Sequence, residues 1–344
     1  MKAIRLHGPL EMRLDEIERP IPKPGEALIR VRAVGVCGSD IHVYKAGGVD
    51  GTQTTTPLIL GHEFAGEIVA LGPRTTEPAV GTRVAIDPAI SCGQCETCLD
   101  GNINCCPNVQ FPSTPPLQGA LAECVVHPAN LCEPLPSALS FADGAMLEPL
   151  GVAIHALSLA RINPGDTVAV LGAGPIGLLC IQLALVSGAH SVYASEPIPE
   201  RRAMAGSAGA IAVCDSTSID PIAWVHEQTD GRGVDVVIEA AWGDQAVVHA
   251  VGMAKPAGRV VLVGISNRGI TDFPAAPARR KGLTILVSRR MQVVYPHAIA
   301  LVEQGRIDVR TLVTHCFPLE QTPEAFSLVA AIADGVGKAM IDIS

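Results

Sequence analysis

The sequence predicts an α/β fold that combines a mainly β domain with a doubly wound parallel sheet. Short strand-like segments occupy residues 25–86, whereas from residue 167 onward apolar strand-like runs alternate with helical segments. Such alternation is typical of a parallel sheet that carries helices on both faces. The 344 residues are enough for about two domains, at roughly 100 to 200 residues each.

Composition narrows the classes of function. Hydrophobic residues make up 48% of the chain and aromatic residues only 3%, so the core must consist of aliphatic side chains and alanine. The net charge is -9 and the sequence has no basic run, so it lacks the cluster of basic residues expected of a protein that binds nucleic acid or an anionic membrane. A small-molecule partner is expected. Met1–Pro20 has no apolar segment typical of a secretory signal, which makes the cytoplasm the default compartment.

The parallel sheet is organised around Thr167–Gly177, which reads T-V-A-V-L-G-A-G-P-I-G. Residues 168–171 form a continuous apolar run, as expected of a strand that is covered on both faces. Gly172 allows a tight turn, Gly174 lets the backbone approach a pyrophosphate, and Gly177 lets the next helix pack closely. The pattern predicts a dinucleotide-binding turn.

The residues after this turn favour NAD as the dinucleotide. Pro175 suits the first turn of a helix over Ile176–Ser187, whose N-terminal amides would point at the phosphates. A second strand, Ser191–Ser195, leads to Glu196. An acidic side chain at that place can accept the ribose hydroxyls of the adenosine half, whereas a 2'-phosphate would meet like charge. NAD is therefore expected rather than NADP.

A membrane span is the alternative interpretation of this region, because no Asp, Glu, Lys or Arg lies between Asp166 and Glu196. The glycines and the proline of the turn at residues 172–177 argue against a spanning helix.

The first domain contains candidate ligands for a catalytic metal. Strands are expected over residues 25–36, 63–71 and 81–86, and the candidates lie beside them or further on: Cys37, His62, Glu63 and Glu148. Thiolate and imidazole suit zinc, and a carboxylate completes a site that keeps one coordination position open for catalysis. Each residue taken singly is more often structural, and no spacing rule joins residues so far apart.

Four cysteines give a sharper signal. Cys92, Cys95 and Cys98 follow the spacing C-x-x-C-x-x-C, and Cys106 comes after a short loop. Four thiolates within one lobe match a closed, tetrahedral structural zinc site. The alternative is a redox-active or free thiol cluster. Cys105 adjoins Cys106, but only one of two neighbouring side chains usually points into such a site, and Cys106 is the predicted ligand.

The remaining chain is expected to complete both domains. Ser140-Phe-Ala-Asp143 is a capping box that opens a helix carrying Glu148 before Pro149. Further helices are expected over residues 199–208, 296–303 and 323–333, and over a segment that ends at Ala254. Further strands are expected over residues 234–240, 259–265 and 282–288. The tail beyond residue 288 has a different pattern and is expected to return to the first domain.

The chain resembles the zinc-dependent medium-chain dehydrogenase family, and within it the sorbitol and xylitol (polyol) dehydrogenase branch. The resemblance covers essentially the whole chain. It is carried by V-C-G-S-D-I-H (36–42), G-H-E-F-A-G (61–66), the four-cysteine lobe, G-A-G-P-I-G (172–177) and L-V-T-H-C-F-P-L-E (312–320). Residues 111–129 and L-E-P-L-G-V-A-I-H-A (147–156) indicate the polyol branch.

This resemblance implies a GroES-like catalytic domain over 1–152 with the structural zinc lobe at 88–110. A Rossmann domain that binds NAD would follow over 153–287, and 288–344 would complete the catalytic domain. Two zinc ions per chain, one catalytic and one structural, and a homotetramer or homodimer are also implied.

The resemblance further implies roles for individual residues. Cys37, His62 and Glu63 match the ligands of the catalytic zinc, while Glu148 matches an acid beside it, and which glutamate binds directly stays open. Ser39 matches the hydroxyl that bonds the substrate oxygen, His42 a proton-relay histidine, and Arg290 an arginine that faces substrate hydroxyls. The implied cofactor-binding residues are Gly172, Gly174, Pro175, Ile176, Gly177, Glu196, Arg201, Val263, Gly264, Ile265, Ser288 and Arg289.

The implied reaction transfers hydride from the carbon that bears a secondary hydroxyl of a polyol to NAD, while the hydroxyl loses its proton and a ketose is formed. Val43 and Met291 stand where the branch often has aromatic residues, which leaves the exact substrate open. One rival is an L-threonine or short-chain diol dehydrogenase, although Ala89 replaces a histidine common in the threonine enzymes. A non-catalytic relative that keeps only the fold is the other rival, but such proteins typically lose the zinc ligands.

Overall fold

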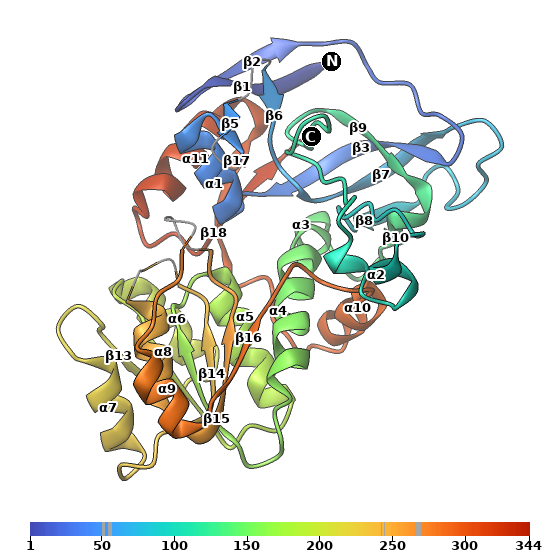
Figure 1. The fold of residues 1–344 in the computed structure, drawn as a ribbon. Coiled ribbons are helices and arrows are strands. Elements are labelled where there is room, and N and C mark those ends of the chain that lie inside the picture. Colours follow the sequence, from blue (N-terminus) through green and yellow to red (C-terminus); the bar gives the residue numbers. More distant parts are fainter. Residues whose placement is uncertain (50–51, 54–56, 242, 244, 266–269) are drawn as a thin grey trace. The chain divides into compact units, whose positions relative to one another are not determined.

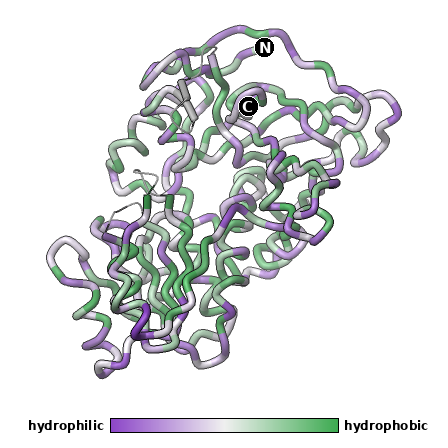
Figure 2. The backbone as a smooth tube through the Cα atoms, in the orientation of Figure 1, coloured by the Kyte–Doolittle hydropathy of each residue, from purple (hydrophilic) through white to green (hydrophobic). Residues whose placement is uncertain are grey.

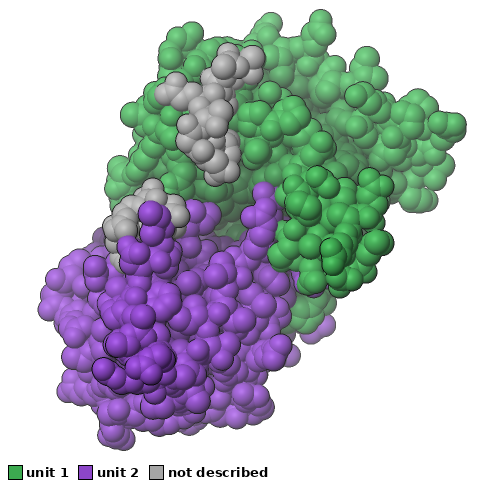
Figure 3. Space-filling view, in the orientation of Figure 1, with its two compact units in different colours: residues 1–149, 295–303, 309–344 green, residues 150–294, 304–308 purple. Residues whose placement is uncertain are grey.

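The computed structural model describes residues 1–49, 52–53, 57–241, 243, 245–265 and 270–344. The chain forms two compact units, which Figure 3 distinguishes by colour. Unit 1 comprises residues 1–149, 295–303 and 309–344, and unit 2 comprises residues 150–294 and 304–308. The C-terminal part of the chain therefore folds with the N-terminal part.

Unit 1 is built on a seven-stranded sheet with the order β10-β8-β7-β3-β18-β17, in which β9 also pairs with β3. Only β17 and β18 pair in parallel; the other pairs are antiparallel. A three-stranded sheet has the order β2-β1-β6, and β4 (Gly48–Val49) pairs with β5 (Thr52–Gln53). The other bounds are Lys2–Gly8 (β1), Glu11–Glu16 (β2), Glu26–Gly35 (β3), Leu58–Ile59 (β6), Glu63–Leu71 (β7), Arg83–Ile86 (β8), Cys124–Pro128 (β9), Cys132–Pro134 (β10), Val313–Pro318 (β17) and Lys338–Asp342 (β18).

The core of unit 1 is aliphatic, as the composition requires, and isoleucines from β1, β3, β7, β8 and β18 meet in one buried cluster. Tyr44 packs edge-on against Phe326 with ring centroids 5.4 Å apart, which joins helices α1 and α11. The helices of unit 1 are Gly38–Ala46 (α1), Glu96–Leu99 (α2), Phe141–Ala145 (α3), the start of Leu147–Ala160 (α4), Tyr295–Glu303 (α10) and Thr322–Ala331 (α11). Short 3-10 helices span Ile103–Cys105, Ala129–Leu131 and Leu319–Gln321.

Unit 2 is a six-stranded parallel sheet with the order β13-β12-β11-β14-β15-β16 (Figure 1). Its strands are Thr167–Leu171 (β11), Ser191–Ser195 (β12), Ala212–Cys214 (β13), Val234–Glu239 (β14), Ala254–Leu262 (β15) and Thr284–Val287 (β16). The connecting helices are Pro175–Val186 (α5), Pro199–Ser207 (α6), Pro221–Gln228 (α7), Ala246–Met253 (α8) and Ala275–Lys281 (α9). The apolar strands stand out in Figure 2. The predicted combination of a mainly β unit and a doubly wound parallel sheet is confirmed.

The glycine-rich turn joins β11 to α5. Gly172 has φ +87°, a left-handed conformation that favours glycine. A Cβ on Gly177 would lie 2.0 Å from the carbonyl oxygen of Gly172, so the helix packs this closely only with glycine there. Helix α5 begins with Pro175 after the cap residue Gly174. The turn therefore presents the first backbone amides of α5 at the carboxyl edge of the sheet.

Some predicted limits are wrong. The capping box at Ser140 is present, with Asp143 N donating to Ser140 Oγ at 3.1 Å, but α3 ends at Ala145. Glu148 lies instead in the first turn of α4, where Pro149 is tolerated because no intrahelical bond from its nitrogen is needed there.

The strand predicted over residues 259–265 also has different limits. Helix α8 ends at Met253, and β15 already begins at Ala254, which pairs with Val234 before the register shifts. Pro256 lies where the register shifts. A proline has no backbone amide to donate, and none is needed at an irregularity in the pairing. Residues 263–265 follow the end of the strand. Helix α11 ends at Ala331 rather than Ala333, because Ile332 adopts a left-handed conformation with φ +50°.

Within the described ranges, no helix is long and apolar enough to cross a membrane. The uncharged stretch between Asp166 and Glu196 is divided among β11, α5 and β12.

A buried ion pair connects β7 to β18. Lys338 Nζ donates to Glu63 Oε1 at 2.8 Å, to Glu63 Oε2 at 2.6 Å and to the Val36 carbonyl oxygen at 3.2 Å. The two charged side chains are only 3% and 1% exposed. Burial by itself lowers the pKa of Lys338, but the Glu63 carboxylate outweighs it and raises that pKa. Gly35 provides the space, because a Cβ there would lie 2.2 Å from Glu63 Oε2.

We expect Lys338→Met to destabilise the protein by about 3–5 kcal/mol, because it leaves the Glu63 charge buried without its partner. The matched control is Lys2→Met, which removes the exposed pair of Lys2 with Glu320, 2.7 Å long and 48% exposed on both sides. The control should leave stability unchanged within error. Chemical denaturation of both variants measures the difference, and equal stability would contradict a structural role for the buried pair.

Candidate metal centres and cofactor turn

Three of the predicted ligands of a catalytic metal lie together in unit 1. Cys37 is the N-cap residue of α1, while His62 immediately precedes β7 and Glu63 begins it. The Cys37 Sγ, a His62 ring nitrogen and a Glu63 carboxylate oxygen all lie within 4.8 Å of one another. Antiparallel pairing of β3 with β7 sets Gly35 opposite Glu63, so the end of one strand meets the start of the other. Thiolate, imidazole and carboxylate form a donor set that suits zinc.

Asp40 orients this group, although the sequence analysis did not identify it. Its buried carboxylate accepts the backbone amides of Cys37 at 3.3 Å and Gly61 at 3.4 Å, and Oδ1 lies 3.3 Å from His62 Nδ1. A carboxylate on one ring nitrogen of a histidine fixes the tautomer and directs the other nitrogen toward a metal. Burial opposes the charge on Asp40, but His62 and the amides outweigh it and lower the pKa of the carboxyl. Asp40 could have been identified from the sequence, because it follows Cys37 by three residues, the spacing of a capping box at the start of a helix.

The two glutamates differ in their surroundings. Glu63 belongs to the metal-ligand group but is already paired with Lys338. Glu148 is buried in the first turn of α4 and does not belong to that group among the described residues. Burial and the charge of Glu63 raise the pKa of Glu148 to about 7, against the opposing charges of His62 and Lys338. A carboxyl with such a pKa can take up or release a proton near neutral pH.

Helix α1 carries the two predicted proton-handling residues. Ser39 Oγ donates to Cys37 Sγ at 3.3 Å, so its hydroxyl lies beside the metal-ligand group. His42 follows one turn later and is half-buried, and burial together with the charge of Lys45 lowers its pKa. Phe111 packs against the His62 ring with centroids 5.0 Å apart. The loop that begins at Phe111, quoted above as a polyol-branch motif, thus borders this group.

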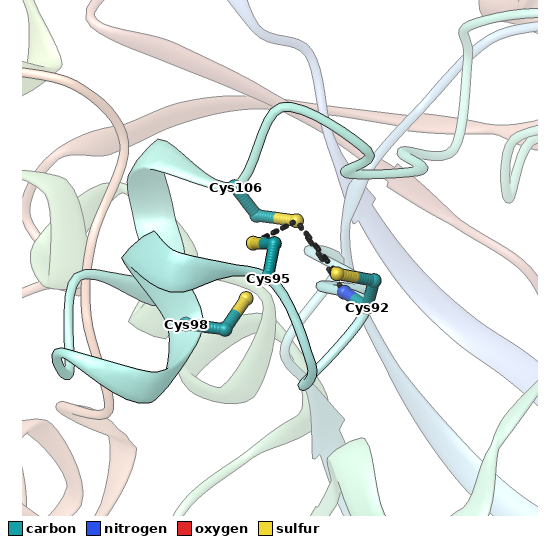
Figure 4. A group of neighbouring side chains, drawn as sticks. All are labelled: Cys92, Cys95, Cys98 and Cys106. Carbon is teal, nitrogen blue, oxygen red and sulfur yellow. Dashed lines mark hydrogen bonds between the residues drawn. The ribbon is translucent and has the colours of Figure 1, made fainter.

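The four predicted structural ligands form the second group. The side chains of Cys92, Cys95, Cys98 and Cys106 point toward one another (Figure 4). Cys106 Sγ lies 3.5 Å from Cys92 Sγ and 3.8 Å from Cys95 Sγ. Sulfurs at the corners of a tetrahedron with Zn–S bonds of about 2.3 Å would be about 3.8 Å apart. Cys105 is exposed and lies outside the group, whereas Cys106 is buried.

The surroundings of the four cysteines also shift the pKa values of their thiols. Backbone amides of Gln94 and Cys95 lower the pKa of Cys92 to about 6, and a hydrogen bond with Thr97 is the main cause that lowers the pKa of Cys95. Burial raises the pKa of Cys98 to about 12. A metal that binds all four as thiolates would displace the proton from Cys98, which couples metal affinity to pH.

In unit 2, Glu196 closes the glycine-rich turn from the end of β12. Its Oε2 accepts the amide of Ala173 at 2.7 Å and its Oε1 accepts the amide of Ile198 at 3.0 Å. The carboxylate is buried, and each oxygen retains a further lone pair. A Cβ on Gly174 would lie 3.8 Å from Arg201 Nη1, so the guanidinium lies beside the turn. The predicted residues Gly172, Gly174, Pro175, Ile176, Gly177, Glu196 and Arg201 are thereby brought together.

The remaining predicted cofactor-binding residues lie after the next strands of the same sheet. Val263, Gly264 and Ile265 follow β15, and Ser288 and Arg289 follow β16. Arg290 comes next, half-buried and with a left-handed backbone of φ +50°. Carboxyl ends of parallel strands share one edge, so these residues lie on the edge that carries the glycine-rich turn.

Comparison with known proteins identifies the family to which the chain belongs. Residues 23–137 match the model of the alcohol dehydrogenase GroES-like domain, and residues 175–304 match that of zinc-binding dehydrogenase. Sorbitol dehydrogenase of Bacillus subtilis is 33% identical over 99% of this chain and 97% of its own length. A protein of Arthroderma otae that carries the name D-xylulose reductase A is 38% identical over 91% of this chain and 90% of its own.

Solved structures of dehydrogenases have the same fold over almost the whole chain. An Escherichia coli oxidoreductase/dehydrogenase of unknown specificity superposes with a TM-score of 0.95 at 34% identity, covering 100% of this chain and 99% of its own. A Sinorhizobium meliloti zinc-binding dehydrogenase bound to NADP has a TM-score of 0.90 at 32% identity, with 99% and 98% covered. An Escherichia coli alcohol dehydrogenase bound to NADH has a TM-score of 0.91 at 31% identity, with 99% of each chain covered. This chain therefore belongs to the zinc-dependent medium-chain alcohol dehydrogenase family, in its sorbitol and xylitol (polyol) dehydrogenase branch.

Proposed function

We propose that this enzyme oxidises a secondary hydroxyl of a sugar alcohol such as sorbitol, xylitol or galactitol to the ketose, with NAD as the hydride acceptor. The observation that carries the proposal is the group of Cys37, His62 and Glu63, a thiolate, imidazole and carboxylate set within 4.8 Å. Such a set can hold a zinc ion while leaving a coordination position open. Bound there, zinc supplies Lewis-acid chemistry that lowers the pKa of the substrate hydroxyl.

The residues of this chain then handle the proton and the substrate. Ser39 lies beside Cys37 and accepts the proton of the substrate hydroxyl, with His42 as the next acceptor on the same helix. The lowered pKa of His42 favours the neutral imidazole, which is the form that can accept a proton. Arg290 donates hydrogen bonds to the further hydroxyls of a polyol.

Of the two glutamates, we propose that Glu63 binds the metal directly and that Glu148 lies beside it. Lys338 engages both oxygens of Glu63 in the structure, and a metal would compete with that ammonium. Glu148, whose pKa is raised to about 7, serves as the acid beside the metal. A lysine that holds one ligand can therefore adjust how tightly the metal is bound.

We propose NAD rather than NADP because Glu196 presents a buried carboxylate at the end of β12. Each of its oxygens can accept a ribose hydroxyl in addition to one backbone amide, whereas a 2'-phosphate would meet like charge. NADP is the second candidate, since the guanidinium of Arg201 lies beside the turn and could pair with such a phosphate.

Three further assignments belong to this proposal. The catalytic domain is assigned to residues 1–152 and 288–344, and the NAD-binding domain to 153–287. A homotetramer or homodimer is the proposed assembly. The cytoplasm is the proposed compartment, because all eleven cysteines are free thiols in the structure and five of them belong to the two candidate metal-ligand groups.

An L-threonine or short-chain diol dehydrogenase remains the alternative within the family. A non-catalytic relative is disfavoured, because the candidate ligands are not only present in sequence but lie together in both groups.

We expect two zinc ions per chain in protein purified without chelator. Cys98→Ala should bind one zinc fewer and unfold at lower denaturant concentration, because a structural site contributes directly to folding. Cys105→Ala, which changes the exposed neighbour of Cys106, is the matched control and should keep both ions. Elemental analysis measures the metal content, and a wild-type value of one or none would exclude two sites.

We expect the specificity constant for NAD to exceed that for NADP, and Glu196→Ala to narrow this gap. Taking the ratio of the two constants cancels any general loss caused by the missing turn contacts. Glu200→Ala, an exposed acid on α6, should leave the ratio unchanged. A wild-type enzyme that uses NADP at least as well as NAD would show that the role given to Glu196 is wrong.

We expect polyols to be oxidised at least tenfold more efficiently than 2-propanol, because a mono-alcohol leaves buried polar groups unpaired at a cost of about 1–3 kcal/mol. Turnover is measured on xylitol, sorbitol, galactitol, 2,3-butanediol, threonine and 2-propanol. Arg290→Ala should lose activity on polyols but not on 2-propanol, and Arg280→Ala on the exposed side of α9 should lose neither. Equal efficiency on 2-propanol would favour a general secondary-alcohol dehydrogenase, and a preference for threonine would favour the alternative.

A further inference from the structure

Strand β14 ends in a buried glutamate that neither zinc group contains. Glu239 is only 2% exposed. Its Oε1 accepts the amide of Ala241 at 2.8 Å, and its Oε2 accepts the amide of Gly264 at 3.1 Å. The backbone oxygen of Glu239 accepts the amides of Val263 at 2.8 Å and Gly264 at 3.1 Å. One residue thus fixes both the turn after β14 and the turn after β15.

The packing around this carboxylate is close. A Cβ on Gly264 would lie 2.0 Å from the Ala241 carbonyl oxygen and 2.5 Å from Glu239 Oε1. The amide of Ala240 donates to the carbonyl oxygen of Leu171, the last residue of β11. The Glu239 carboxylate therefore sets the path of two chain segments beside the glycine-rich turn.

Stability does not explain a carboxylate at this place. Burial raises the pKa of Glu239 to about 6, and the two amides only partly offset it. Among the residues that the structure describes, no cation pairs with Glu239. Asp235, on the same strand, is different, because Arg232 at 2.7 Å and Lys255 at 2.5 Å pair with it. A carboxylate without a cation is costly to bury, which points to a use in shaping the edge of the sheet.

The position along the sheet indicates which part of the cofactor is affected. Strand β11 has β12 on one side and β14 on the other, so the strand order reverses at β11. In such a sheet a dinucleotide lies across the reversal, with one mononucleotide half on each side. Glu196 at the end of β12 is assigned to the adenosine half. The turns held by Glu239 lie on the opposite side, where the nicotinamide half belongs.

We propose that Glu239 is a positioning residue that shapes the backbone on the nicotinamide side of the cofactor site, without touching the reacting atoms. The inference rests on the proposed dinucleotide cofactor but not on the choice between NAD and NADP.

The test is Glu239→Gln, which keeps size but replaces one acceptor oxygen by an NH2 group that faces a backbone amide. The dissociation constant of NADH, followed by nicotinamide fluorescence, should rise about tenfold, because the two displaced turns no longer fit the nicotinamide half. The dissociation constant of ADP, which contacts only the adenosine side, should change less than twofold. Equal weakening of both ligands, or of neither, would overturn the proposal.

Two further variants separate positioning from stability. Asp235→Asn removes a paired acid from the same strand and should lower stability while leaving both dissociation constants unchanged. Glu239→Asp keeps the charge and should restore part of the NADH affinity, and it replaces the glutamine variant in the test if that variant does not fold.

A measurement without cofactor keeps the inference separate from the proposed function. Amide hydrogen exchange at Ala241 and Gly264 should accelerate at least tenfold in Glu239→Gln and not in Asp235→Asn. Unchanged exchange would overturn the positioning role. If the wild-type protein bound neither NADH nor NADPH, the proposed cofactor would be wrong, and the exchange result would still decide whether Glu239 holds the two turns.

Discussion

The buried pair of Glu63 and Lys338 is the interaction on which unit 1 depends. It joins a strand that begins at the candidate metal centre to the last strand of the chain, and it forms only if the C-terminal segment returns to pair with β3. Because an unpaired charge in that place would be costly, the pair couples completion of the fold to the geometry of a candidate metal ligand. The same ammonium would compete with a metal ion bound at Glu63, so the pair would affect both stability and the proposed metal site.

Buried carboxylates bound by backbone amides recur at each functional edge of the protein. Asp40 holds the amides of Cys37 and Gly61 beside His62, Glu196 holds those of Ala173 and Ile198, and Glu239 holds those of Ala241 and Gly264. A charged acceptor that binds two amides fixes a turn more firmly than a neutral one. The protein thus uses acidic side chains to hold irregular backbone at the places where metal and cofactor are proposed to bind.

Local patterns allowed much of this to be predicted. The strand over residues 63–71 and the strand over residues 191–195 were predicted with the limits that the structure shows, since both are short, largely apolar segments that closely follow a glycine. The limits of α3 and β15 were wrong, because a proline in the first turn of a helix or in a bulge looks in sequence like a break. Strands β1 and β2 were not predicted, since charged residues are interspersed along both.

The sequence by itself determined the fold class, the glycine-rich turn and the four-cysteine lobe, because the residues of each motif are close in the chain and their spacing limits how they can be arranged. Asp40, Lys338 and Glu239 did not stand out, since nothing in a single buried acid or lysine names its partner. Only the tertiary structure decided that Lys338 lies on Glu63, and that Cys37 and His62 share one carboxylate. Those contacts depend on strand order and register, which bring together residues that no sequence spacing relates.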